Sequence, residues 1–308
     1  MYFKSITIIL LLKRTHLLNR STYGFEQSLF LWNLIPNKYQ ATAMFALAHY
    51  FDRIAYPVPG VPSLENLKRL HRHHVMAIPF ENLDIHYPKT ILLEEDRFFD
   101  KIVRQRRGGF CYEQNGLLYE VLRQLGYQVY LISASVYQVD EDEFGPPAAH
   151  VAIIAEFNEE QWLVDVGFGS SFPEPLLMAK DKLQEQDGVM YVIKRSVDGN
   201  FVLDRSYNGG KSYTPMYRFD LTPYKLDHFQ EMCHFHQTSE ESPLYRKKLI
   251  SIAKPGGRIT LTNRQLIITQ GEEQQETAIR EETDFQEKLR QYFGYRIVEG
   301  QVRSDHDT

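Results

Sequence analysis

The sequence predicts an α+β fold in which a helical segment is followed by an antiparallel β-sheet and then by a mixed α/β module. Up to Leu125, apolar residues recur at the spacing of a helix face. From Tyr127 the apolar period shortens from about 3.6 residues to about two, and turn residues separate short apolar runs. That pattern is typical of an antiparallel barrel or sandwich. After Pro223 the helical and the strand periods of apolar residues both occur again.

Composition and charge narrow the class of protein. The chain has 308 residues, which predicts about two domains, and its 43% apolar and 24% charged residues fit neither a disordered nor a fibrous protein. It carries 35 Lys plus Arg against 40 Asp plus Glu, a net charge of −5, so no nucleic-acid partner is expected. Two cysteines, Cys111 and Cys233, are too few for a disulfide framework. We therefore expect a globular protein of the cytoplasm.

The first forty residues differ in composition from the remainder. Their apolar run, Ile6 to Leu12, is far shorter than the roughly 20 residues of a membrane helix, and basic residues follow it without a cleavage site. Neither a membrane anchor nor a secretory signal is expected. The stretch is basic and superficially resembles an organelle transit peptide. We favour instead an extension over residues 1–43 that lies outside the core, with Met44 as a natural alternative start.

Residues 44–126 are predicted to form a helical domain. Ser63 is a suitable N-cap, because apolar residues follow it at helix-face spacing. A short helix is expected over residues 96–104. The strongest helix follows Cys111 and ends at Gly126, since a left-handed glycine commonly ends a helix. The apolar stripe of that helix comprises Leu117, Leu118, Val121, Leu122 and Leu125.

Residues 127–223 are predicted to form the β domain, and residues 224–308 a third, α/β domain. Pro215 places the last strand of the β domain at a sheet edge, because proline lacks the N–H that an interior strand donates. The strands expected in the β domain are 129–137, 150–157, 162–166, 189–194, 201–207 and 212–221. The elements expected in the third domain are a helix from Asp227, strands at 259–261 and 265–268, and a helix over 283–293.

Cys111 is the candidate nucleophile. It follows two adjacent glycines, Gly108 and Gly109, and stands on the first turn of the strongest predicted helix. The positive end of the helix dipole is expected to lower the pKa of its thiol, and the free amides of that turn are suited to stabilise an oxyanion. The alternative is a small buried hydrophobic residue, which is what most free cysteines are.

His150 and Asp165 are the candidate base and orienting carboxylate. His150 begins an apolar strand, and Asp165 ends the next one, with a turn near Asn158 between them. A hairpin of this length makes the two residues close cross-strand neighbours. A carboxylate in an apolar strand is costly to bury unless it is paired, and an imidazolium is a suitable partner. Taken singly, each residue also has a purely structural explanation. His150 is explained as a histidine at a strand edge, and Asp165 as the cap of a strand end.

Four blocks together resemble the arylamine N-acetyltransferases. They are Arg107 to Glu113 (Arg-Gly-Gly-x-Cys-x-Glu), His150-Val151, Asp165 to Gly169 (Asp-Val-Gly-Phe-Gly) and Ile78 to Leu83 (Ile-Pro-Phe-Glu-Asn-Leu). The resemblance extends from about Met44 to the C-terminus and is weaker after Pro223. It implies a helical bundle, a β-barrel and an α/β lid, with a core related to transglutaminases and papain-like proteases.

The resemblance also implies an activity and its participants. Acetyl-CoA would acetylate Cys111, and an arylamine or hydrazine would then take the acetyl group in ping-pong order, with His150 as base and Asp165 fixing the imidazole. Phe110, Phe168 and Gly169 are the expected substrate-binding residues, whereas ordinary core packing is at least as good an explanation for Phe80. The resemblance implies no metal, and the oligomeric state is not predicted.

Other functions remain open on the sequence alone. A triad thiol hydrolase or transglutaminase-type enzyme would use the same residues, and a family amide synthase would take its acyl chain from a carrier. A catalytically silent binding module is disfavoured, because all three triad positions are filled. Cys233-His234-Phe235-His236 matches no structural zinc spacing, and a strand or a disordered helix end explains it better. Arg107 is expected to pair with Glu81 or Asp84 rather than with a phosphate.

Overall fold

The structure is a computed structural model, and it describes residues 46–57, 61–87, 89–271, 273–298 and 300–304. Helices form its first part. The prediction for residues 1–43 lies outside these residues. The described residues belong to a compact unit that begins at Phe45. None of its described helices is both long and apolar enough to cross a membrane.

Local sequence signals place the boundaries of the helices. Helix α4 (Leu64–Ala77) begins after Ser63, whose Oγ accepts a hydrogen bond from the backbone of Asn66 at 3.1 Å, as the N-cap prediction requires. Helix α7 (Cys111–Gln124) is followed by Gly126 in the left-handed conformation, with φ of 89°. The helix predicted over residues 96–104 is present, as α6 (Glu95–Phe99) followed directly by a π-helical segment, η1 (Asp100–Arg104). A separate short helix, α5 (Leu83–His86), precedes it.

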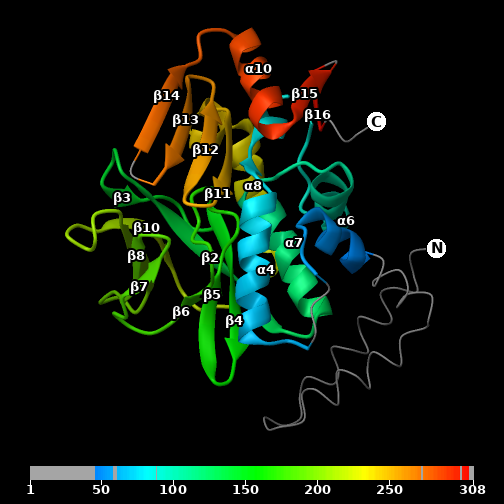
Figure 1. The fold of residues 1–308 in the computed structure, drawn as a ribbon. Coiled ribbons are helices and arrows are strands. Elements are labelled where there is room, and N and C mark those ends of the chain that lie inside the picture. The colour runs from blue at the N-terminus through cyan, green and yellow to red at the C-terminus, as the bar shows by residue number, and fades with distance from the viewer. Residues whose placement is uncertain (1–45, 58–60, 88, 272, 299, 305–308) are drawn as a thin grey trace, which may run out of the picture. The chain divides into compact units, whose positions relative to one another are not determined.

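An antiparallel sheet of nine strands follows, with strand order β6-β5-β4-β2-β10-β9-β8-β7 and β3 paired to β2 (Figure 1). Helix α7 packs against β2 and β4. The strands are β2 (Gln128–Gln138), β3 (Glu143–Phe144), β4 (His150–Phe157), β5 (Glu160–Val164), β6 (Leu176–Leu177), β7 (Gln184–Gln186), β8 (Val189–Arg195), β9 (Phe201–Ser206) and β10 (Thr214–Phe219).

The placement of Pro215 at a sheet edge is wrong, because β10 lies between β2 and β9. The ladder with β2 includes only Tyr217 to Phe219, and a bulge separates Pro215 from Tyr217 in the ladder with β9. Pro215 therefore lies beyond the part of β10 that pairs with β2. Its missing N–H costs no hydrogen bond on that side.

Glutamine side chains connect the two terminal strands of this sheet. The amide of Gln184 accepts from the backbone of Leu177 at 2.8 Å and donates to its carbonyl at 3.0 Å. Gln186 makes the same pair of bonds to the backbone of Glu174. These amides take the place of a neighbouring strand, so the sheet is a nearly closed barrel. The sequence pattern left barrel and sandwich open, and the barrel that the resemblance implied is present.

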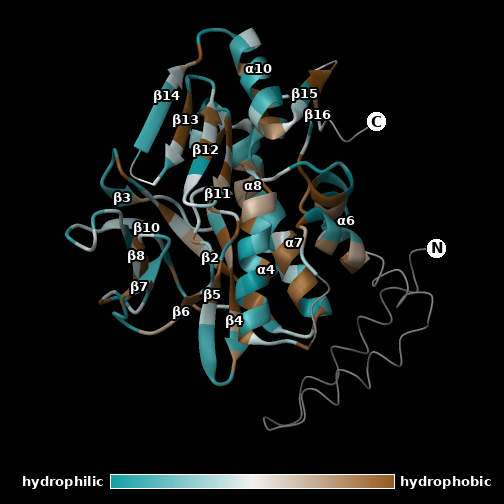
Figure 2. Ribbon diagram, in the orientation of Figure 1, coloured by the Kyte–Doolittle hydropathy of each residue, from teal (hydrophilic) through white to brown (hydrophobic). Residues whose placement is uncertain are grey.

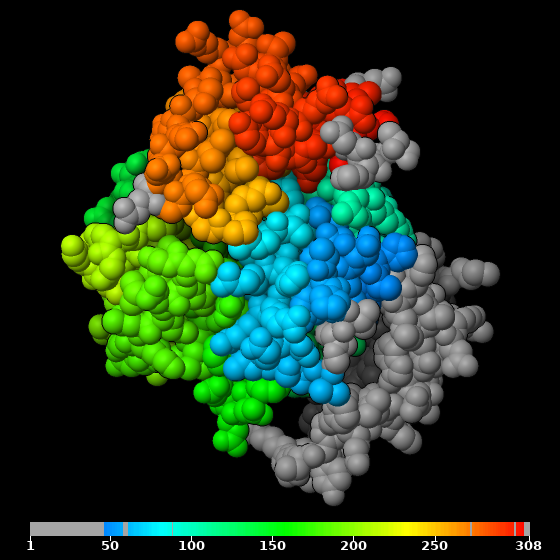
Figure 3. Space-filling model, viewed as in Figure 1, coloured from blue at the N-terminus to red at the C-terminus, as the bar shows by residue number. Residues whose placement is uncertain are grey.

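The last part of the chain forms a second antiparallel sheet, with strand order β1-β11-β12-β13-β14. In Figure 3 the surface of this sheet and of α10 (orange to red) adjoins that of α4 (cyan). The strands are β1 (Phe80–Glu81), β11 (Leu249–Lys254), β12 (Gly257–Thr262), β13 (Gln265–Gln270) and β14 (Glu273–Ala278), and a hairpin of β15 (Tyr295–Val298) and β16 (Gln301–Ser304) follows. The helical elements are η2 (Leu226–Phe229), α8 (Gln230–Thr238), α9 (Pro243–Arg246) and α10 (Glu282–Phe293).

Three strands of this second sheet, β1, β11 and β14, escaped prediction, and for β14 and β1 the reason is physical. Strand β14 is exposed along its whole length and hydrophilic (Figure 2), so it has no apolar alternation to detect. Strand β1 is only two residues long, and it pairs with β11, which connects the helical segment to the C-terminal sheet. The fold class is confirmed as helices, an antiparallel barrel and an α/β lid. The predicted domain boundaries stay predictions.

Candidate active site

A cavity of about 760 Å³ lies at the N-terminus of α7 and at the start of β4. Cys111 and His150 line it together with Gly167 and Phe168, and its walls are mainly apolar. Residues after β10 contribute another wall, chiefly from α8 and α9: Met232, Phe235, His236, Glu241, Pro243, Leu244, Arg246 and Leu249. Two of the three predicted catalytic residues therefore share one ligand-sized space.

Cys111 is the first residue of α7, and the glycines before it allow the chain to reach that position. A Cβ on Gly108 would lie 2.1 Å from the carbonyl oxygen of Pro79, so only glycine fits there. The backbone N–H of Phe110 donates to Oε2 of Glu113 at 3.1 Å. Glu113 thus braces the start of the helix.

The protonation state of Cys111 differs from the expectation. Burial raises the pKa of its thiol well above the ordinary value, and hydrogen bonds from the backbone of Val151 and Tyr112 offset only part of that effect. The side chain has little exposure, whereas a helix terminus contributes only about 0.3–1 kcal/mol. The predicted lowering of the thiol pKa is therefore wrong, because desolvation of the sulfur outweighs the helix dipole. Attack by this sulfur requires a base.

His150 stands at the start of β4 with its ring directed at Asp165. Its Nε2 lies 2.8 Å from Oδ2 of Asp165. Because an ionised carboxylate only accepts, Nε2 carries the proton and Nδ1 is left as the basic nitrogen. The edge of the imidazole meets the ring of Phe168, with centroids 5.3 Å apart. The predicted proximity of His150 and Asp165 is confirmed.

Asp165 is fully buried, and four donors surround its carboxylate. Oδ1 accepts from Nδ2 of Asn115 at 2.9 Å and from the backbone of Gly167 at 2.9 Å. Oδ2 accepts from His150 and from the hydroxyl of Tyr217 at 3.0 Å. Burial alone would raise the pKa of this carboxyl, but the imidazole of His150 and these hydrogen bonds hold it below the ordinary value. Asp165 therefore stays ionised at neutral pH.

Asn115 and Tyr217 were missed by sequence reasoning. Asn115 stands four positions after Cys111, on the same helix face, and is a polar residue in line with the apolar Leu118 and Leu122. That spacing was a usable signal. Tyr217 lies on β10, far along the chain, and no local pattern connects it with Asp165.

Gly167 lets the loop after β5 pack directly on the nucleophile. A Cβ at this position would lie 2.7 Å from Cα of Cys111 and 2.8 Å from Nδ2 of Asn115. Real Cβ atoms do not approach so closely, so only glycine fits here. The loop, the start of α7 and Asn115 are thereby fixed against one another.

The three predicted substrate-binding residues have different surroundings. Phe168 lines the cavity. Phe110 is fully buried edge-to-face against Tyr112 and is absent from the cavity wall, because it faces the core. Gly169 adopts φ of 83° and packs on the ring of Phe80, and its carbonyl accepts from Arg258. Substrate contact therefore stays a prediction, and the geometry favours it for Phe168 alone of these three.

A buried cluster of charges lies beneath the nucleophile's helix. Arg107 contacts Glu81 at 2.5 Å and Asp84 at 2.7 Å, which confirms the predicted pairing. Lys101 lies 2.9 Å from Glu113 and 3.0 Å from Asp84. The cluster has two cations and three carboxylates, and burial raises the pKa of Glu113 to about 7.

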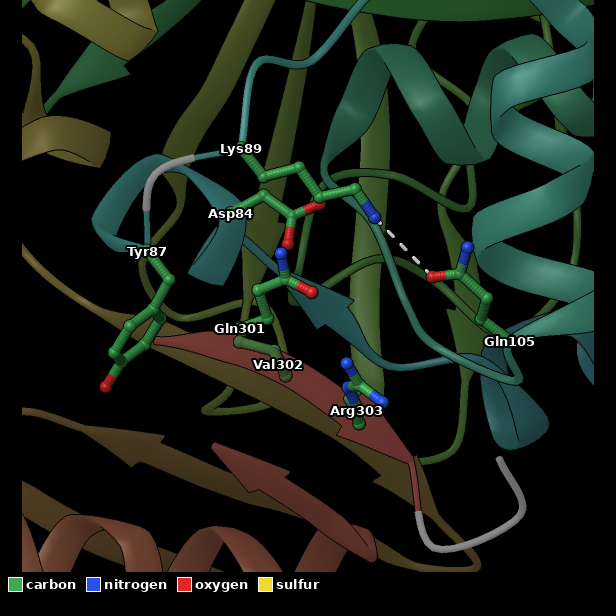
Figure 4. Close-up of a pocket in the computed structure, with 7 residues that line it drawn as sticks. All are labelled: Asp84, Tyr87, Lys89, Gln105, Gln301, Val302 and Arg303. Atoms are coloured by element: carbon green, nitrogen blue, oxygen red, sulfur yellow. Dashed lines mark hydrogen bonds between the residues drawn. The ribbon is translucent and has the colours of Figure 1, made fainter. Parts of the chain in front are cut away.

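Other polar groups lie apart from this site. Cys233 and His236 are on α8, not on a strand or a disordered end, and His236 Nδ1 accepts from the hydroxyl of Ser242 at 2.8 Å. Among the described residues no group of three His, Cys, Asp or Glu side chains is arranged to hold a metal ion. A smaller cavity of about 240 Å³ lies beside β16, where Lys89 donates to Gln105 (Figure 4). None of the three predicted catalytic residues lines it.

Comparison with known proteins defines the class. Residues 63–302 match a family model described as N-acetyltransferase. An arylamine N-acetyltransferase of Escherichia coli is 34% identical over 220 residues, which are 70% of this chain and 76% of that enzyme. The fold and these matches thus define an acyltransferase.

Solved structures agree with this class. The arylamine N-acetyltransferase of Salmonella typhimurium matches with a TM-score of 0.74 and 29% identity, covering 81% of this chain and 90% of that one. The enzyme of Mycobacterium abscessus matches with a TM-score of 0.77 and 26% identity, covering 92% and 95% of the two chains. The chain belongs to the arylamine N-acetyltransferase family.

Proposed function

We propose that this enzyme transfers an acetyl group from acetyl-CoA to the amino group of an arylamine or arylhydrazine, through an acetyl-cysteine formed on Cys111. The observation that supports this most is the shared cavity, which Cys111 and His150 both line, with Nε2–H of His150 held by a buried, ionised carboxylate. The mainly apolar walls suit an aromatic acceptor and limit the access of water to the acyl-enzyme.

The first half-reaction begins with a thiol. Nδ1 of His150 takes the proton as the sulfur of Cys111 attacks the thioester carbonyl, and Asp165 stabilises the imidazolium. The bond between the carbonyl carbon and the CoA sulfur then breaks. CoA leaves as a thiol after it receives the proton from His150.

The second half-reaction reverses the roles. The amine nitrogen attacks the acetyl carbonyl, and His150 accepts a proton from the nitrogen. The bond to Cys111 breaks, and its sulfur is reprotonated by the imidazolium. One nucleophile that serves two substrates in turn gives ping-pong kinetics.

The cellular setting belongs to the same proposal. The chain carries net negative charge, and both cysteines are free in the structure, so we place the enzyme in the reducing cytoplasm with small-molecule partners only.

Intact-mass measurement with acetyl-CoA alone tests the mechanism. We expect the enzyme to gain ~42 Da, one acetyl group on Cys111, and to lose it when an arylamine is added. The Cys111→Ser variant should gain nothing. Loss of the adduct without amine would favour the hydrolase alternative, and substantial acetyl transfer by Cys111→Ser would remove Cys111 from its role.

A further inference from the structure

The segment from Asp165 to Pro173 contains no helix or strand, and it carries three parts of the site. It begins with the carboxylate that orients His150, packs Gly167 on Cys111, and presents Phe168 to the cavity. A segment without regular structure depends on other groups for its backbone partners. The residues that hold its ends therefore determine where these parts lie.

His71, on α4, contacts both ends of this segment. Its ring is fully buried. Nδ1 lies 3.0 Å from the carbonyl oxygen of Pro173, and Nε2 lies 3.1 Å from the carbonyl oxygen and 3.3 Å from the backbone nitrogen of Asp165. The ring also stacks on Phe172, with centroids 5.5 Å apart and planes inclined by 10°.

The neutral ring bonds to the Asp165 backbone in either tautomer. Burial lowers the pKa of His71 to about 4, so the imidazole carries a single proton at neutral pH. A proton on Nδ1 donates to the Pro173 carbonyl and leaves Nε2 to accept from the backbone N–H of Asp165, whereas a proton on Nε2 donates to the Asp165 carbonyl. The Asp165 carbonyl also accepts from the hydroxyl of Ser171.

We propose that His71 is a positioning residue for acyl transfer, which clasps the Asp165–Pro173 segment at both ends and so fixes the orienting carboxylate and Phe168. The inference rests on the proposed function of Cys111, His150 and Asp165. His71 acts through backbone atoms and touches neither substrate. The bond at Asp165 supports the chemical step, whereas the bond at Pro173 supports the cavity wall.

The experiment replaces the imidazole with a ring of similar size. His71→Phe keeps a ring against Phe172 and removes both hydrogen bonds. We expect kcat/KM for acetyl transfer to fall about 10- to 100-fold, because a small misplacement of catalytic groups costs this much. The matched control is His73→Phe, since His73 is on the same helix but its Nδ1 bonds to the carbonyl of Ile54, not to the segment. That variant should stay within about twofold of wild type.

Two further substitutions separate the two bonds and serve if His71→Phe folds poorly. The amide of His71→Asn reaches the place of Nδ1 and keeps the bond to Pro173, and that of His71→Gln reaches the place of Nε2 and keeps the bond to Asp165. We expect the Asn variant to lose mainly kcat and the Gln variant mainly to raise KM. A role in folding alone would lower the melting temperatures of these variants and leave kcat and KM unchanged.

The outcomes separate this inference from the proposed function. If Cys111→Ser is inactive while all three His71 variants match the kinetics of wild type, the positioning role is overturned and the proposed function stands. If Cys111→Ser still acetylates, the proposed function itself fails.

Discussion

Asp165 orients His150 through the hydrogen bond at its Nε2. Four hydrogen bonds hold its carboxylate where solvent does not reach, and its lowered pKa keeps it charged. The proton of His150 is thereby placed on Nε2, and the proposed mechanism uses the free Nδ1 to take the proton of the thiol. The reactivity of the cysteine is thus a property of the arrangement rather than of the sulfur alone.

We expect Asp165→Asn to reduce kcat about 1,000- to 10,000-fold, because an amide allows the wrong imidazole tautomer. Steady-state acetylation measures the loss. Asp204→Asn is a suitable control, since Asp204 is also a buried aspartate of the barrel but bonds to Lys194 at 2.6 Å. Comparable losses in both variants would show that the effect is not specific to the orienting carboxylate.

Alkylation by iodoacetamide tests access and protonation at the two cysteines. Cys111 lines the cavity, whereas Cys233 is buried beside Gln237, and burial raises its pKa to about 12. We expect labelling of Cys111 only, slowed by acetyl-CoA. The raised pKa of the Cys111 thiol predicts a rate that keeps rising above pH 8 as more thiolate forms. A plateau reached below pH 7 would contradict it.

Helix α7 connects the nucleophile to the interior of the molecule. Its N-terminus carries Cys111, its first turn carries Glu113, and Asn115 reaches from it to Asp165. The carboxylate of Glu113 supports the backbone before the cysteine and contacts Lys101. The start of this helix is therefore fixed by charges that the substrate does not reach.

Glu113→Gln is expected to flatten the pH dependence of stability relative to wild type. The folded-state pKa of Glu113, about 7, lies above the unfolded value, so its contribution is fully present below about pH 4.5 and is lost as pH rises through 7. The amide does not ionise and can still accept from Phe110. Between pH 5 and 8 the free energy of unfolding of the variant should rise relative to wild type by on the order of 1–3 kcal/mol, measured with urea. If the difference in unfolding free energy between the variant and wild type stayed constant across that pH range, the raised pKa of Glu113 would be refuted.

Across the whole described unit, the buried charge cluster joins parts that are distant in sequence. Arg107 contacts Glu81 of β1 and Asp84 of α5, and it donates to the carbonyl of Val302 in the C-terminal hairpin at 3.2 Å. The segment before the nucleophile is thus held to both the helical part and the lid.

Arg107→Met should lower the free energy of unfolding by about 3–5 kcal/mol, because Glu81 and Asp84 lose one of the two cations that neutralise them in the buried cluster. Arg104→Met is the matched control, since Arg104 forms an exposed pair with Asp100 at 3.5 Å, and its loss should cost less than about 1 kcal/mol. Urea unfolding of both variants provides the comparison. Equal effects would show that burial of the Arg107 cluster does not contribute to stability.

The sequence by itself determined what local signals encode: the cap of α4, the glycine turn before Cys111, the helix that starts there, and the hairpin that brings His150 to Asp165. It also determined the family, because four short motifs occur in order. Only the tertiary structure decided the protonation of Cys111, the place of Pro215 inside the sheet, and the partners of Asp165. These depend on how deeply a group is buried and on which distant segment packs against it. Neither quantity has a local pattern along the chain.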